Sequence, residues 1–179
     1  MKVMLSGSRS INSFPPVVED KITQLCKSEV TFLIGDAPGA DTVFQKVLLN
    51  LGYPNVFVYH VDIFPRNNLG NWSAIKIETT RKTRNWLYFG KKDIEMTKSC
   101  NQSLIVWDGE SDGSILNCFR ALNDDKEVFF FNLDQKYEIK FENMIEFEKY
   151  FKSKLEDSIL RKIKKENRSI SKSKQALLF

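Results

Sequence analysis

Apolar and polar positions along this chain form a regular succession of short apolar runs and longer amphipathic stretches. The apolar runs, which have the length and continuity of buried strands, lie at residues 3–6, 30–34, 56–61, 104–107 and 128–131. Apolar residues recur at helical spacing after Pro16, after Asp41, from Lys92 and from Ile115. Strands that alternate with helices predict an α/β fold: a Rossmann-like, mostly parallel sheet with helices on both faces.

The pattern changes towards the C-terminus. Residues 137–141 alternate between polar and apolar side chains, which predicts an edge strand in a hairpin. Residues 143–166 read as one amphipathic helix, whose apolar face needs either the sheet or another chain, as in a homo-oligomer. We therefore expect a domain at 1–142, a helix at 143–166 and a flexible basic tail at 167–179. Residues 73–90 give no clear pattern, and the run 86–89 fits a strand or a buried loop.

Composition places the chain among globular proteins. Of its 179 residues, 42% are hydrophobic and 28% are charged. No apolar run approaches the roughly 20 residues that span a bilayer, and the N-terminal apolar stretch is too short for a signal peptide. We therefore expect a cytoplasmic protein without a membrane partner. Three widely spaced cysteines and a single histidine, His60, argue against a metal site and a histidine-based triad.

The positive charge is concentrated at the C-terminal end. The net charge is +4, and residues 152–174 hold nine Lys or Arg against three Asp or Glu, an excess of six. The remaining residues therefore have a net charge of −2, which is +4 minus +6. The folded body does not read as a basic nucleic-acid surface, so non-specific DNA contact is expected only from the basic tail.

Four loops that follow predicted strands carry the candidate chemistry: residues 7–10, 35–41, 62–72 and 108–114. The carboxyl ends of parallel strands share one rim of a sheet, and ligands bind there where the strand order switches. Free backbone N–H groups at the following helix N-termini suit a phosphate or another anion. We therefore expect these loops to surround one ligand site, and no motif in the sequence identifies a cofactor.

The motifs in these loops resemble the SLOG superfamily, which includes the DNA-processing protein A and Lonely Guy families. They are Gly7-Ser8-Arg9, Gly35-x-x-x-Gly39-Ala-Asp41 and Trp107-Asp-Gly-x-Ser-x-Gly-Ser114, together with the Arg-Asn-Asn-Leu-Gly-Asn-Trp stretch at 66–72. The resemblance covers about residues 1–135 and is nearest to small uncharacterised bacterial members. It implies a Rossmann-like fold that binds nucleotides or nucleotide-derived molecules, as a sensor or an adaptor.

The resemblance implies three groups of ligand-binding residues. The floor of the pocket is lined by Gly7, Ser8 and Arg9. A wall is formed by Gly35, Gly39 and Asp41. A phosphate is held by Gly113 and Ser114. The same loops add Asp36, Arg66, Asn67, Asp108, Gly109 and Ser111 as candidates, because arginine binds phosphate bidentately and glycine allows close backbone approach.

Several of these residues have a second interpretation. Asp41 fits an N-cap as well as a ligand contact, and Asp36 fits a turn residue. Trp107 fits the core, although a strand end also permits base stacking. Arg81 and Arg84 fit a solvated face or a phosphate contact.

The sequence departs from the hydrolytic branch of the superfamily. In the turn that corresponds to residues 108–114, Lonely Guy phosphoribohydrolases carry the pattern Pro-Gly-Gly-x-Gly-Thr-x-x-Glu. This chain has Asn117 in place of the glutamate. An amide cannot act as a carboxylate acid, base or nucleophile. Asp41, Asp108 and Glu110 are substitute candidates for an N-glycosidase acting on nucleoside 5′-monophosphates. A DNA-binding accessory resembling DNA-processing protein A is a further alternative.

The last five residues, Gln175-Ala-Leu-Leu-Phe179, resemble the pentapeptide that binds the bacterial sliding clamp. In that resemblance Gln175 anchors by hydrogen bonds, while Leu178 and Phe179 fill an apolar pocket. The alternative is that these apolar residues fold back on the domain or mediate self-association.

Overall fold

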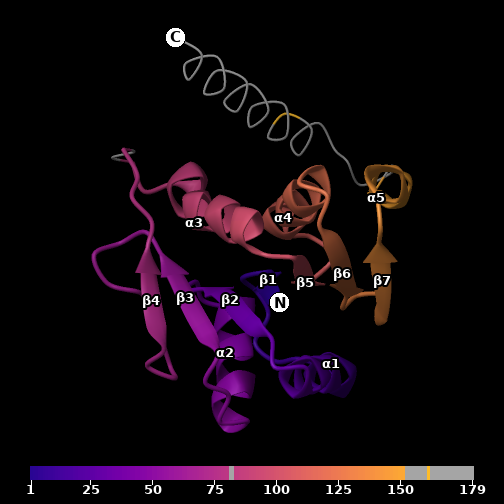
Figure 1. The fold of residues 1–179 in the computed structure, drawn as a ribbon. Coiled ribbons are helices and arrows are strands. Elements are labelled where there is room, and N and C mark those ends of the chain that lie inside the picture. The colour runs from indigo at the N-terminus through magenta and orange to yellow at the C-terminus, as the bar shows by residue number, and fades with distance from the viewer. Residues whose placement is uncertain (81–82, 152–160, 162–179) are drawn as a thin grey trace.

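The computed structural model describes residues 1–80, 83–151 and 161 and contains a seven-stranded sheet (Figure 1). The strand order is β4-β3-β2-β1-β5-β6-β7, and every neighbouring pair is parallel except β6–β7. The strands are β1 (Lys2–Gly7), β2 (Thr31–Gly35), β3 (Val56–His60), β4 (Ser73–Lys76), β5 (Gln102–Trp107), β6 (Glu127–Asn132) and β7 (Tyr137–Phe141). This arrangement confirms the predicted Rossmann-like α/β fold.

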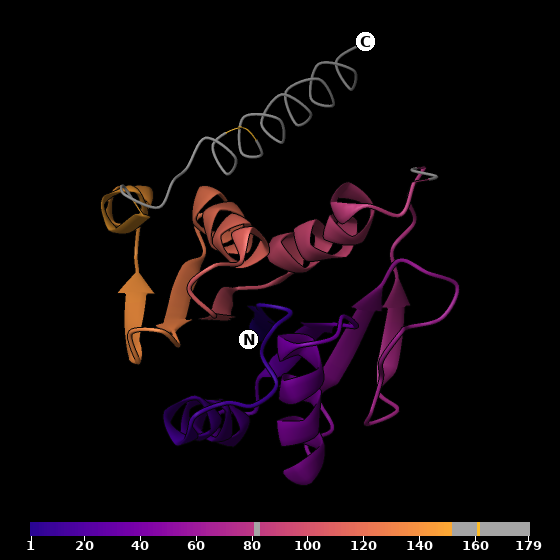
Figure 2. The same cartoon turned by 180° about the vertical axis from the view of Figure 1, so that it is seen from behind.

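Helices cover both faces of the sheet. The helices are α1 (Pro16–Lys27), α2 (Ala40–Asn50), α3 (Trp86–Ser99), α4 (Asp112–Asn123) and α5 (Met144–Phe151). In Figure 1, α1 and α2 lie on one face and α3 and α4 on the other, and the rear view in Figure 2 shows the same two layers. The central strands are therefore buried on both sides, which explains why β5 is buried along its whole length.

The strand order switches direction between β1 and β5, because the chain crosses back over the sheet from β4 through α3 to β5. Strands β2, β3 and β4 lie on one side of β1, whereas β5, β6 and β7 lie on the other. Ser6 and Gly7 at the end of β1 stand opposite Ile105 and Val106 of β5. The loops that leave these two strands diverge to opposite sides, and this leaves room for a ligand at the rim.

Helix α5 closes an aromatic core on one side of the sheet. Phe147 and Phe151 of α5 are 1% and 0% exposed, and they pack with Trp107, Phe130 and Phe141. In the described part of the expected 143–166 helix, Phe147 and Phe151 therefore pack against this chain's own core, whereas Ile145 is 77% exposed. Trp107, which is 1% exposed, belongs to the core, as one of its two interpretations predicted.

The region at 73–90 corrects the sequence interpretation. Helix α3 begins at Trp86 rather than near Lys92, so the run 86–89 is its first turn and not a strand or a loop. The side chain of Asn85 caps this turn by accepting hydrogen bonds from the N–H groups of Leu87 and Tyr88. Strand β4, a short edge strand beside β3, has no counterpart in the predicted pattern because its four residues are mostly exposed.

The loop at 62–72 is ordered by its own side chains. Asn68 hydrogen-bonds with both the N–H and the carbonyl of Trp72, and the indole N–H of Trp72 donates to the carbonyl of Tyr53.

Within the described residues, no helix is long and apolar enough to cross a membrane.

Candidate functional site

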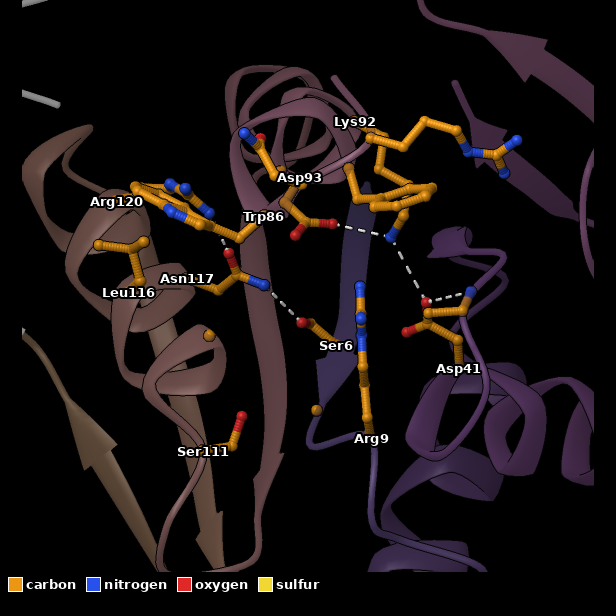
Figure 3. Close-up of a pocket in the computed structure, with 17 residues that line it drawn as sticks. Ser6, Arg9, Asp41, Trp86, Lys92, Asp93, Ser111, Leu116, Asn117 and Arg120 are labelled. Atoms are coloured by element: carbon orange, nitrogen blue, oxygen red, sulfur yellow. Dashed lines mark hydrogen bonds and ion pairs between the residues drawn. The ribbon is translucent and has the colours of Figure 1, made fainter. Parts of the chain in front are cut away.

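A cavity of about 450 Å³ opens at the carboxyl rim of the sheet, beside the switch point between β1 and β5 (Figure 3). Its volume lies within the range of small-molecule sites, about 300–1,000 Å³. Its lining comes from the end of β1, the start of α2, the first half of α3, the loops next to these elements, and one face of α4 that extends to Arg120 in its last turn. The residues are Ser6, Gly7, Arg9, Ala37, Asp41, Arg84, Asn85, Trp86, Phe89, Gly90, Lys92, Asp93, Ser111, Gly113, Leu116, Asn117 and Arg120.

Three helices begin at this cavity. Gly39, with φ +86°, precedes α2, Asn85 precedes α3 and Ser111 precedes α4. The helix dipole adds partial positive charge at each of these N-termini. In α3 the N–H groups of Leu87 and Tyr88 already donate to Asn85, and in α2 the N–H of Ala40 donates to the carbonyl of Ser8. The cavity therefore lies where an anion is stabilised from several directions.

Arg9 contributes an uncompensated positive charge to the cavity. The residue is exposed, and its guanidinium lies 5.8 Å from the centre of the Phe89 ring. Among the residues that the structure describes, it makes no hydrogen bond and no ion pair. Five N–H donors in a planar fork are therefore available to a ligand such as a phosphate.

A buried lysine lies between two carboxylates on one side of the cavity. The ammonium of Lys92, a residue that is 4% exposed, lies 2.8 Å from Asp93 Oδ1 and 3.4 Å from Asp41 Oδ2. Burial would lower the pKa of Lys92, but the charges of Asp93 and Asp41 outweigh it and the net shift is upward. Burial raises the pKa of Asp41, because the more distant ammonium only partly offsets the loss of hydration. Lys92 is therefore a fixed cation.

The opposite wall holds a chain of hydrogen bonds from β1 to α4. Asn117 donates from Nδ2 to Ser6 Oγ at 2.7 Å and accepts at Oδ1 from Arg120 Nη1 at 2.5 Å. Figure 3 shows Arg120, Asn117 and Ser6 following one another down this wall. The position that carries a glutamate in the hydrolytic branch therefore faces the cavity but presents an amide that already has two partners.

Two arginine–aspartate pairs hold the side of the cavity near α3. Arg66 pairs with Asp36 at 2.6 Å and lies over the Phe89 ring at 4.4 Å. Burial raises the pKa of Asp36, but the hydrogen bonds from Arg66 outweigh it and lower the pKa overall. Arg84 pairs with Asp62 at 2.6 Å, and its side chain is 61% exposed. Arg84 thus lines the cavity, rather than only a solvated face.

The predicted ligand residues separate into two sets. One set lines the cavity: Gly7, Arg9, Asp41, Ser111 and Gly113. The other set supports it from outside the lining: Ser8, Gly35, Asp36, Gly39, Arg66, Asn67, Asp108, Gly109 and Ser114. Glu110, a catalytic candidate, is exposed and also lies outside the lining.

The supporting residues have specific partners. Ser8 Oγ and Ser114 Oγ are buried and lie 3.0 Å apart, which couples the first loop to the start of α4. Asn67 donates to Thr42 Oγ1 at 2.6 Å. A methyl group on Gly35 would lie 2.2 Å from both Asp41 Oδ2 and Lys92 Nζ, so only glycine leaves room for that ion pair.

Asp108 organises the turn between β5 and α4. Its carboxylate accepts hydrogen bonds from the Ser10 hydroxyl and from the N–H groups of Glu110 and Ser111. Burial raises its pKa, but these bonds outweigh burial and lower it. Asp108 is therefore an ionised turn residue in this structure. Gly109 follows with φ +93°, a conformation that favours glycine.

Most of the residues that α3 contributes to the cavity wall were not predicted from the sequence. Trp86, Phe89, Lys92 and Asp93 were not candidates, because this segment lacked a clear pattern and its charges resembled a solvated face. The cue available in the sequence was Asn85, an N-cap residue that would have placed the start of the helix at the rim. The clamp-motif residues Gln175, Leu178 and Phe179, and also Arg81, lie outside the described residues.

Two solved structures share this fold. DNA processing protein A from Helicobacter pylori, which has a single-stranded DNA binding mode, aligns with a TM-score of 0.56 and 20% identity, over 73% of this chain and 65% of that one. DNA processing protein A from Streptococcus pneumoniae aligns with a TM-score of 0.57 and 20% identity, over 73% and 50% of the two chains. The chain thus spans less than two thirds of each neighbour. No family model and no curated protein matches the sequence, and the likeness establishes a DNA processing protein A-like fold.

Proposed function

We propose that the rim cavity binds a nucleotide or a nucleotide-derived molecule through its phosphate, so that the protein acts as a sensor or an adaptor of the SLOG type. The observation that carries this proposal is the unpaired guanidinium of Arg9 in a cavity where three helices begin. An anion there gains charge-assisted hydrogen bonds without displacing an existing partner. The cavity also has aromatic walls, Trp86 and Phe89, that suit a base.

Replacement of Arg9 by alanine is expected to weaken the binding of a nucleoside 5′-monophosphate by about tenfold or more, because hydrogen bonds between charged groups contribute about 1.5–3 kcal/mol. Isothermal titration calorimetry with AMP, GMP, CMP and UMP measures this effect. Lys46→Ala is the matched control, since Lys46 is an exposed cation of α2 outside the cavity lining. Unchanged affinity in Arg9→Ala, or no binding of any of the four nucleotides to the natural protein, would contradict the proposal.

A DNA-binding accessory role is the second candidate. The fold similarity to DNA processing protein A, and the exposure of Trp86 (39%) and Phe64 (78%), favour it. Aromatic side chains beside arginines form stacking platforms for single strands. The slightly negative balance outside residues 152–174 opposes it. In the same calorimetric series, tight binding of an oligothymidylate together with no binding of mononucleotides would favour this role over the first.

The hydrolase alternative has less support. Among the three candidate carboxylates, only Asp41 lines the cavity, and its Oδ2 already accepts from the N–H of Ala37 and lies beside Lys92. Asn117 offers no carboxylate on the opposite wall. A general acid and a nucleophile on either side of a glycosidic bond are therefore not paired across the cavity in the way that the reaction requires.

Attachment to the sliding clamp through Gln175, Leu178 and Phe179 stays part of the proposed adaptor role. Deletion of residues 175–179 is expected to abolish binding to the purified clamp and to leave nucleotide affinity unchanged, because the cavity lining ends at Arg120. Surface plasmon resonance with immobilised clamp measures the first effect. A tail mutant that binds the clamp as well as the full chain does would exclude this role for the pentapeptide.

A further inference from the structure

The side of the cavity opposite Asn117 carries hydrogen-bond acceptors that phosphate binding does not use. Asp41 and Asp93 each hold Lys92 with one oxygen, Oδ2 and Oδ1 respectively. The second oxygen of each carboxylate has no hydrogen-bond partner within the described residues. Figure 3 shows the two carboxylates on either side of the Lys92 ammonium, which they share.

Both unpartnered oxygens border open space. No fully buried polar side-chain atom in the described part of the chain lacks a hydrogen-bond partner, so neither oxygen is sealed inside the protein. Asp41 is nevertheless only 6% exposed, and both aspartates line the cavity. The accessible face of each carboxylate is therefore the cavity itself, where each can accept a hydrogen bond from a ligand.

The charges around these oxygens select the kind of donor. Lys92 already occupies the position between the two carboxylates, and Arg9 adds a second cation at the same cavity. A cationic ligand would be repelled by both. Neutral hydroxyl groups, in contrast, can donate to the carboxylates without adding charge. An anionic group fits beside Arg9, and hydroxyl donors fit beside Asp41 and Asp93.

We propose that Asp41 and Asp93 accept hydrogen bonds from the ribose hydroxyls of the ligand, so that the cavity selects ribonucleotides over nucleotides that lack these hydroxyls. This inference rests on the proposed nucleotide-binding function and specifies its ligand class. Lys92 is a positioning residue here: its ammonium contacts one oxygen of each carboxylate and so orients both groups, and it leaves one acceptor on each of them free. The same ammonium limits the repulsion between the two aspartates.

The test compares each ribonucleoside 5′-monophosphate with its 2′,3′-dideoxy counterpart by titration calorimetry on the full chain. The natural protein is expected to bind the ribonucleotide about tenfold or more tightly, because each lost hydroxyl leaves an acceptor unpaired. Equal affinities for the two sugars would overturn the inference and leave the proposed function intact. Binding of neither sugar would overturn the proposed function, and with it the inference.

The variant Asp93→Asn tests whether the carboxylate of Asp93 accepts a hydrogen bond from the ribose. In this variant the ammonium of Lys92, which can only donate, binds the amide oxygen of the new asparagine. The amide NH₂ group, also a donor, therefore faces the cavity. The ribose preference is expected to fall to about threefold or less, while the affinity for the dideoxynucleotide stays unchanged. Asp20→Asn, an exposed carboxylate of α1 on the other face of the sheet, is the matched control. A full ribose preference in Asp93→Asn would overturn the role of Asp93.

Discussion

Replacement of Lys92 by methionine is expected to lower the free energy of unfolding at pH 7 by about 3–5 kcal/mol, the usual cost of removing one partner from a buried ion pair. Methionine fills a similar volume but leaves the carboxylates of Asp41 and Asp93 without their shared cation. Asp41, at 6% exposure, has little water to replace the ammonium. The loss therefore reflects an uncompensated buried charge rather than a cavity.

The loss in Lys92→Met is expected to depend on pH. Burial already raises the pKa of Asp41 in the natural protein, and removal of the ammonium, the main influence that opposes burial, raises this pKa further. A group whose folded pKa is raised contributes stability that is present below its unfolded pKa and lost as the pH rises through the folded pKa. The difference between variant and natural protein should therefore be small near pH 4 and full at pH 7.

Urea unfolding at pH 4 and pH 7 measures both effects. Lys91→Met is the matched control, because Lys91 is the neighbouring residue of α3 and its ion pair with Glu95 lies at the surface, with 39% of the lysine side chain exposed. Surface pairs contribute about 0–1 kcal/mol, so the control should lose little. Similar losses in the two variants, or a loss in Lys92→Met that is the same at both pH values, would show that the buried pair has no special role.

Replacement of Gly39 by alanine is expected to cost about 2–4 kcal/mol and to weaken ligand binding at the same time. Gly39 has φ +86° and ψ −135°, a conformation that is essentially restricted to glycine. A Cβ atom there would lie 2.3–2.5 Å from the backbone O, Cα and C atoms of Arg9. Backbone atoms cannot rotate away as a side chain does, so either Arg9 or the start of α2 must move.

Gly52→Ala separates the effect of contact from that of conformation. Gly52 also has positive φ, +62°, but a Cβ atom there would meet nothing within 4 Å. The control should therefore lose only about 1 kcal/mol, the cost of the left-handed backbone alone. Urea unfolding gives the stabilities, and calorimetry with nucleoside monophosphates gives the affinities. If Gly39→Ala and Gly52→Ala behave alike in both measurements, the close approach of Gly39 to Arg9 has no functional consequence.

The amino-acid sequence by itself determined the order of the elements except β4 and the start of α3, and it predicted that the candidate site lies at the rim of the sheet. Near-continuous apolar runs such as 104–107 specify strands covered on both faces, and such strands pair in parallel. Parallel strands carry all their following loops to one rim. The loops that begin at Gly7, Gly35 and Asp108 were therefore predictable as neighbours, because this conclusion needs only local periodicity and topology.

Only the tertiary structure decided which side chains meet at that rim. Lys92 follows Lys91 on a helix and reads as a solvated charge, yet it pairs with Asp41, which lies 51 positions away. Asp93 and Asn117 likewise gain their roles from partners on other elements. The helical spacing of residues predicts which of them share a face of the helix. It does not predict how deeply that face is buried or which charged residue of another element contacts it. Those contacts depend on how α3 and α4 pack over the sheet, and no local pattern encodes that packing.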